Sequence, residues 1–153
     1  MFRFQKTKTM SKFLEKVCLI IITLTLVPTV ASAANKDAKG TSKVDWEPVM
    51  KAIIQVESGG KSNARNGNQC GAMQITPILV AECNNILKQQ GSKKRYTLKD
   101  RFDVKKSKEM FLLIQSHHNP KNNVEHAIRS WNGGQKYSRR ATQRYFEKVM
   151  SYL

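Results

Sequence analysis

The stretch DWEPVMKAIIQVESGG, residues 45–60, decides the fold of this 153-residue chain. Asp45 can cap a helix, Pro48 is tolerated in a first turn, and Gly59-Gly60 stops helical structure. The apolar residues between them recur at the three- and four-residue spacing of one helix face: Trp46, Val49, Met50, Ile53, Ile54 and Val56. The stretch therefore predicts an amphipathic helix from about Asp45 to Ser58.

Glu57 is the unusual residue of this helix, because a carboxyl stands where the pattern is apolar. At about 100° per residue, Glu57 falls on the same face as Met50 and Ile53. An apolar wall and the negative end of the helix dipole both favour a protonated carboxyl near neutral pH. A neutral carboxylic acid can protonate a leaving glycosidic oxygen. Glu57 is thus a candidate general acid, unless its side chain turns into solvent.

Four further helices are predicted after this one, and the sequence shows no β-hairpin signal and no internal repeat. Thr76-Pro77 opens the first of them, Asp103 caps the second, and Gly133-Gly134 ends the third. The expected ranges are 78–90, 104–118, 124–132 and 138–153, with irregular segments at 59–72 and 91–103. The sequence predicts one all-α domain.

The N-terminal segment is typical of an exported protein. Basic residues precede the apolar run 17–27, and Ala31-Ser32-Ala33 places small residues where a signal peptidase cuts. An uncleaved membrane anchor is the alternative, although the run is shorter than the ~20 residues that span a bilayer. We expect a signal peptide over 1–33, cleaved after Ala33, a disordered leader over 34–43, and a domain over 44–153 in the periplasm or outside the cell.

The charge and the cysteines suggest partners and compartment. The formal net charge is +16, and +12 once residues 1–33 are removed, which favours a polyanionic partner, such as an acidic cell-wall polymer or an anionic membrane. Export argues against nucleic acid. Cys18 would leave with the signal peptide, so Cys70 and Cys83 remain as a pair where disulfides form. We expect a disulfide between them; two reduced, buried cysteines are the alternative.

Four short blocks occur in order along the rest of the chain. They are Glu57-Ser58-Gly59-Gly60, Gly71-Ala72-Met73-Gln74-Ile75-Thr76-Pro77, Ala127-Ile128-Arg129-Ser130-Trp131-Asn132-Gly133-Gly134, and Thr142 with Tyr145. This succession resembles the soluble lytic transglycosylase (SLT) domain of the lysozyme-like superfamily, over about residues 46–153. The resemblance implies a small lysozyme-like helical domain with a catalytic cleft. It also implies an enzyme that cleaves the β-1,4 bond between MurNAc and GlcNAc in peptidoglycan and forms 1,6-anhydro-MurNAc.

The resemblance also implies roles for single residues. Glu57 would be the one general acid and then base, and Ser58 would orient it or the sugar. Met73 and Gln74 would line the cleft, with Gln74 bonding an N-acetyl or hydroxyl group. Asn132 would lie across the cleft from Glu57.

Aromatic and glycine positions complete the implied site. Trp131 would close the pocket, and Gly71, Gly133 and Gly134 would let the backbone approach the glycan, unless they serve turn geometry alone. Two residues depart from the family pattern. Trp131 replaces a tyrosine, so it can donate a hydrogen bond to Glu57 but cannot accept one. Ala72 replaces a leucine beside the cleft.

Other sequence features suggest neither a metal nor a cofactor. His117, His118 and His126 lack the further ligands that a zinc site needs at its usual spacing. A basic stripe on the last helix, Arg140, Arg144 and Lys148, is either a solvated face or a surface that docks on the anionic wall.

Several alternatives remain open. The expected partners are peptidoglycan glycan strands and, for the cellular role, a secretion or conjugation apparatus, with the protein itself a monomer. A hydrolytic muramidase on the same fold is one alternative, in which water intercepts the intermediate. A non-catalytic cationic cell-wall-binding protein is the other.

Overall fold

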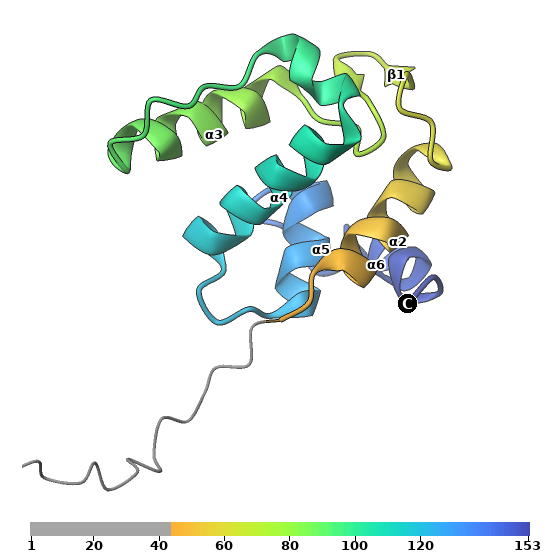
Figure 1. Ribbon diagram of the computed structural model, residues 1–153. Coiled ribbons are helices and arrows are strands. Elements are labelled where there is room, and N and C mark those ends of the chain that lie inside the picture. The colour runs from red at the N-terminus through yellow and green to blue at the C-terminus, as the bar shows by residue number, and fades with distance from the viewer. Residues whose placement is uncertain (1–43) are drawn as a thin grey trace, which may run out of the picture. The chain divides into compact units, whose positions relative to one another are not determined.

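The computed structural model describes residues 44–153, and the expected signal peptide and leader lie outside the described residues. The elements in chain order are α2 (Glu47–Ser58), β1 (Arg65–Asn66), β2 (Gln69–Cys70), α3 (Pro77–Gln89), the 3-10 helix η1 (Leu98–Phe102), α4 (Val104–His118), α5 (Val124–Gly133) and α6 (Gln143–Met150). In Figure 1, α3 lies along the upper edge, and α2 and α6 lie together at the lower right. The prediction of a mainly α-helical fold is confirmed.

Short polar side chains set the helix starts. α2 begins two residues later than expected, with Trp46 rather than Asp45 at the N-cap, and the Asp45 carboxylate accepts a hydrogen bond from the backbone N–H of Glu47 over 2.9 Å. Thr76, Asp103 and Asn123 each accept a backbone N–H at the start of α3, α4 and α5. For α2 to α5 the predicted bounds differ from the observed ones by no more than two residues.

The last helix is shorter than the sequence suggested. Residues 138–153 were expected to be helical, but α6 spans only Gln143–Met150. Thr142 donates its hydroxyl to the Ser138 carbonyl over 2.9 Å, and the Ser138 hydroxyl accepts from the N–H of Ala141. Such local side-chain bonds favour turns over helix. The segment before α6 is therefore a series of turns.

A small β-hairpin lies within the segment 59–72, where only a loop was expected. Strands β1 and β2 pair antiparallel, with Arg65 opposite Cys70 and Asn66 opposite Gln69. Gly67 has a φ of 57° in the two-residue turn between them. The statement that the sequence holds no hairpin signal is thus wrong, because Gly67-Asn68, the two residues of this turn, are such a signal. The sequence also missed η1 within residues 91–103.

The core is centred on Phe111 of α4. Its fully buried ring packs edge-on against Trp46, with 5.8 Å between ring centroids, and lies tilted against Trp131 of α5, with 5.2 Å between ring centroids. Buried aliphatic side chains of α2, α3, α4 and α5 surround it, including Ile53, Ile86, Met110 and Ile128. Burial of this apolar surface is the main force that holds the helices together.

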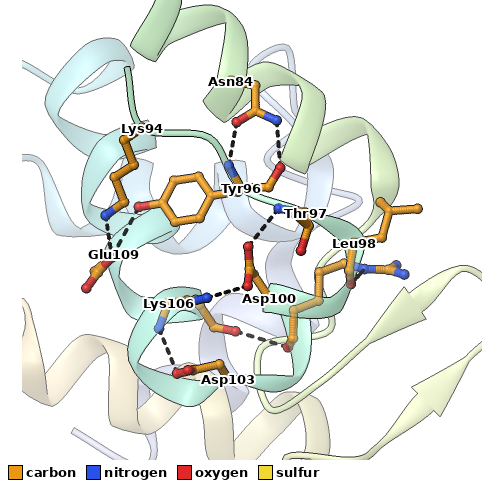
Figure 2. A network of polar contacts seen from close by, with 11 residues as sticks. Asn84, Lys94, Tyr96, Thr97, Leu98, Asp100, Asp103, Lys106 and Glu109 are labelled. Atoms are coloured by element: carbon orange, nitrogen blue, oxygen red, sulfur yellow. Dashed lines mark hydrogen bonds and ion pairs between the residues drawn. The ribbon is translucent and has the colours of Figure 1, made fainter. Parts of the chain in front are cut away.

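A polar network joins α3, the segment after it and α4, as Figure 2 shows. The side-chain amide of Asn84 on α3 bonds both backbone groups of Tyr96, over 2.9 and 2.8 Å. The Lys94 ammonium and the Tyr96 hydroxyl both reach Glu109 on α4. The backbone N–H of Thr97 donates to Asp100 over 2.7 Å, which fixes the start of η1. The network therefore fastens α3 to α4.

The expected disulfide is not formed. Cys70 and Cys83 are both free, buried cysteines. Their sulfur atoms have separate neighbours: Cys70 lies 3.9 Å from a guanidinium nitrogen of Arg65, and Cys83 lies 3.8 Å from the Met110 carbonyl. Burial raises the pKa of the Cys83 thiol to about 12, so this thiol stays protonated. Cys83 thus acts as a core side chain between α3 and α4.

Candidate active site

Glu57 lies in the last turn of α2, on the wall of a cavity of about 420 Å³. Gln74, Trp131 and Asn132 line the same cavity, so the structure brings four of the predicted site residues together. The remaining wall is largely neutral, with Gln69, Thr76, Ile78, Leu79, Ile114, Ser130, Gly134 and Gln135 among its residues. A pocket of this size, with the half-buried Glu57 carboxyl beside apolar and amide groups, can bind a sugar and present an acid to it.

Tyr145 of α6 holds the carboxyl. Its hydroxyl donates a hydrogen bond to Oε1 of Glu57 over 2.7 Å. Tyr145 belongs to the last of the four sequence blocks, for which no role in the site was predicted. A tyrosine hydroxyl can also accept a hydrogen bond, which the indole N–H of Trp131 cannot. Tyr145 therefore fixes the orientation of Glu57, although the two residues lie 88 positions apart in the chain.

Burial sets the protonation of Glu57. Desolvation in the cavity wall raises the pKa of the Glu57 carboxyl above the ordinary glutamate value. The Tyr145 hydrogen bond and the charge of Lys148 oppose this rise without cancelling it. Burial and the adjacent Glu57 also raise the pKa of Tyr145, which keeps its hydroxyl protonated as a donor. The site thus favours a neutral carboxylic acid at Glu57.

We expect Tyr145→Phe to move the pH dependence of cleavage toward higher pH. The tyrosine hydrogen bond lowers the pKa of Glu57, so its loss lets the pKa rise further. A general acid must be protonated, and activity falls as pH rises through its pKa. The alkaline limb of the kcat/KM profile should therefore shift upward, and Lys148→Gln should shift it in the same direction. An unchanged or lowered limb in Tyr145→Phe would show that the hydroxyl does not control this carboxyl.

Ser58 connects α2 to the loop that carries Gln74. Its hydroxyl lies 2.9 Å from the Ala72 carbonyl and 3.2 Å from the Ile54 carbonyl, and it donates to these backbone oxygens. Ser58 is not among the residues that line the cavity. Its contacts are those of a residue that positions the end of α2, and hence Glu57, rather than one that touches the sugar.

Gln74 has a strained backbone. Its φ is 50°, in the left-handed region that few residues other than glycine adopt. The side-chain amide nitrogen donates to the Gly71 carbonyl over 2.8 Å, while the amide oxygen has no hydrogen-bond partner among residues 44–153. The loop therefore fixes the amide and leaves its oxygen available as an acceptor in the cavity.

Three expectations for the neighbouring residues need correction. Met73 is 0% exposed and packs in the core, so its side chain does not line the cleft. The Trp131 indole N–H donates to the Met73 carbonyl over 3.3 Å, not to Glu57. Gly71 is buried against the Arg101 carbonyl rather than open to a glycan, because a Cβ at Gly71 would overlap that oxygen.

The glycines at the end of α5 differ from each other. A Cβ on Gly133 would come within 2.8 Å of Thr142 and Tyr137, so Gly133 serves packing between α5 and the turns before α6. Gly134 has a φ of 73°, lies on the cavity wall and has open space beside it. Only Gly134 meets the expectation of backbone close to a bound ligand.

Glu82 of α3 and His118 of α4 also line the cavity, and the sequence analysis assigned neither of them to the site. Nε2 of His118 lies 2.9 Å from Oε1 of Glu82. Glu82 is the second carboxyl of this cavity. Within residues 44–153 no cluster of three or more His, Cys, Asp and Glu side chains is placed to hold a metal ion. No helix in this part of the chain is long and apolar enough to cross a membrane.

A glutamic acid shielded from water at a cleft, with a raised pKa, is also the general acid with which lysozyme cuts glycans. The family model of the transglycosylase SLT domain matches residues 31–152, so the chain belongs to this family, within the lysozyme-like superfamily. The family's activity is transglycosylase-type cleavage of peptidoglycan. No curated protein and no solved structure matches the chain.

Proposed function

We propose that this protein is an exported lytic transglycosylase that cleaves the β-1,4 bond between MurNAc and GlcNAc and leaves 1,6-anhydro-MurNAc. The observation that carries the proposal is Glu57, a half-buried carboxyl with a raised pKa, held by Tyr145 on the wall of a sugar-sized cavity. The signal-like N-terminus and the charge of +16 agree with an anionic cell-wall substrate.

In the first step Glu57 acts as the acid. Its proton passes to the glycosidic oxygen, the bond from that oxygen to C1 of MurNAc breaks, and the GlcNAc side leaves with a free hydroxyl. The N-acetyl carbonyl oxygen of the same MurNAc stabilises the positive charge at C1. The Gln74 amide oxygen is free to accept a hydrogen bond from the sugar or its N-acetyl N–H, which would hold C1 near Glu57.

In the second step Glu57 acts as the base. Its carboxylate, still hydrogen-bonded by Tyr145, takes the proton from the C6 hydroxyl of the MurNAc. The C6 oxygen then bonds to C1 and closes the 1,6-anhydro ring. Glu57 ends the cycle protonated, and no water is consumed. One carboxyl therefore suffices for both steps.

Hydrolysis is the second candidate, because Glu82 places another carboxyl on the same cavity. In glycosidases that use water, a second carboxylate serves as base or nucleophile. Against this role, one oxygen of Glu82 is engaged by His118 at 2.9 Å. The two mechanisms differ in whether an oxygen atom of water appears at C1 of the product.

Release of soluble fragments from purified peptidoglycan tests for catalysis. We expect wild-type protein to release muropeptides continuously, with each molecule acting many times. A non-catalytic cell-wall-binding protein would instead co-sediment with peptidoglycan and release nothing. Failure to release fragments at any pH, with binding intact, would contradict the proposal.

A further inference from the structure

In the described part of the chain, the cavity wall carries two carboxyl side chains and no Lys or Arg, although the protein is strongly basic. The chain has 27 Lys and Arg residues against 11 Asp and Glu. Within residues 44–153, none of the residues that line the cavity is Lys or Arg; its titratable side chains are Glu57, Glu82 and His118. A wall of this kind attracts a positive group and repels a carboxylate, whereas the basic exterior does the reverse.

Glu82 has hydrogen-bonding capacity to spare. Its side chain is 45% exposed and that of His118 is 25% exposed, so a ligand in the cavity can reach both. A carboxylate offers about four acceptor positions, and among the described residues His118 alone bonds to Glu82. A half-exposed pair of this kind contributes little to folding, so stability does not account for its place in the cavity.

An exposed apolar side chain, that of Ile78, lies one helical turn from Glu82. Ile78 precedes it by four residues on α3, so both side chains project from the same face of the helix. Ile78 also lines the cavity and is 77% exposed. An exposed aliphatic side chain beside a carboxylate suits a ligand with an aliphatic chain that ends in an ammonium group.

We propose that Glu82, with His118 and Ile78, forms a subsite for the free primary amine of the peptide stem attached to the glycan. This inference rests on the proposed function and specifies its substrate. The glycan itself carries no cation, whereas a stem peptide with a diamino acid ends an aliphatic side chain in an ammonium group. The Glu82 carboxylate binds the ammonium and Ile78 contacts the methylene groups. The enzyme therefore prefers strands whose stems keep a free amine.

Acetylation of the substrate's amines tests the subsite. The substrates are peptidoglycan rich in uncross-linked stems and the same material after N-acetylation. For wild-type protein we expect acetylation to raise KM, with kcat little changed, so that kcat/KM falls about three- to tenfold, as for one partly exposed charge-assisted hydrogen bond. Acetylation makes the substrate more anionic, so general attraction to the basic surface predicts the opposite change.

Glu82→Gln is the diagnostic variant, and Glu47→Gln is its matched control. Like Glu82, Glu47 is a partly exposed glutamate, 41% exposed, that bonds a nitrogen-bearing side chain of another helix, here Lys108 of α4. Unlike Glu82, Glu47 lies outside this cavity. On native substrate we expect Glu82→Gln to lose the same three- to tenfold in kcat/KM and to become insensitive to acetylation. Glu47→Gln should respond to acetylation as wild type does.

Three results would overturn the subsite. The first is acetylation that weakens cleavage by Glu82→Gln as strongly as by wild type. The second is Glu82→Gln that matches wild type on native substrate. The third is that Glu82→Gln cleaves the native and the acetylated substrate more slowly than wild type by the same factor, which would mean that Glu82 is a catalytic or purely structural carboxyl. If wild type cleaves neither substrate, the proposed function fails instead. Co-sedimentation with native and acetylated peptidoglycan then measures the amine preference directly.

Discussion

Glu57→Gln is expected to cleave peptidoglycan far more slowly than wild type. The loss should reach at least the roughly 10²–10⁴-fold that a positioned acid or base contributes. Glutamine keeps the shape of the side chain and can still accept the Tyr145 hydroxyl, which donates over 2.7 Å in the wild type. It cannot release a proton to the glycosidic oxygen or take one from the C6 hydroxyl. Because one group serves both steps, both are lost together.

The same variant should be as stable as wild type or more stable. The folded-state pKa of Glu57 is raised, so the native protein holds its proton at pH values where the unfolded chain has released it. Stability therefore falls as pH rises from the unfolded pKa to the folded one, and glutamine removes this loss. Thermal unfolding at neutral pH checks this. Glu147→Gln, on the exposed side of α6, is the control and should keep full activity.

A structural role for Glu57 would give the opposite pattern. Near-wild-type cleavage by Glu57→Gln would remove Glu57 from the mechanism. A lower melting temperature together with lost cleavage would mean that the carboxyl supports the fold. Retained binding to peptidoglycan in the inactive variant separates loss of chemistry from loss of substrate.

Gly71→Ala is expected to destabilise the domain by about 3 kcal/mol or more, a large share of the stability of a small domain. Gly71 has a φ of 80°, where a side chain is strained, and its Cβ would overlap the Arg101 carbonyl oxygen. Neither backbone can move freely. The Gly71 carbonyl also accepts the Gln74 amide, and the Arg101 guanidinium donates to the Ile75 carbonyl, so the strain reaches the cavity wall.

Gly67→Ala is the matched control for Gly71→Ala. Gly67 also has a positive φ, 57°, but a Cβ there meets nothing within 4 Å. Its substitution should cost only the backbone strain, about 1–2 kcal/mol. Chemical denaturation of both variants measures the difference. Equal losses in the two variants would show that the contact with Arg101 does not limit this position.

Local sequence predicted the elements that local interactions determine. Thr76 and Asp103, which the sequence placed at helix starts, cap α3 and α4 by accepting the backbone N–H three residues on, and such signals are readable from sequence. The hairpin was missed because its flanking residues, such as Arg65 and Gln69, show no apolar alternation. Only the turn pair Gly67-Asn68 indicated it.

The site was predicted in part for the same reason. Glu57 was found because the apolar pattern of its helix can be read from neighbouring residues. The four blocks supplied Gln74, Trp131 and Asn132. The Glu82–His118 pair joins residues 36 positions apart on two helices, so no spacing rule indicates it.

Side-chain directions were beyond the reach of sequence reasoning. The Trp131 indole bonds the Met73 carbonyl because of how α5 packs on the loop before α3. Cys70 and Cys83 are suitably spaced for a disulfide, yet each sulfur lies against a different neighbour in the folded domain. These directions depend on packing between distant segments, and they correct the roles that resemblance alone assigned.

Digestion of peptidoglycan in ¹⁸O-enriched water, followed by mass spectrometry of the released muropeptides, tests the central claim most directly. A transglycosylase takes the C6 oxygen of the MurNAc itself, so we expect products that end in 1,6-anhydro-MurNAc, one water lighter than reducing-end products and free of ¹⁸O. Products that carry one ¹⁸O at C1 of a reducing MurNAc would show that water attacks C1. That result would contradict the mechanism and identify the protein as a hydrolase.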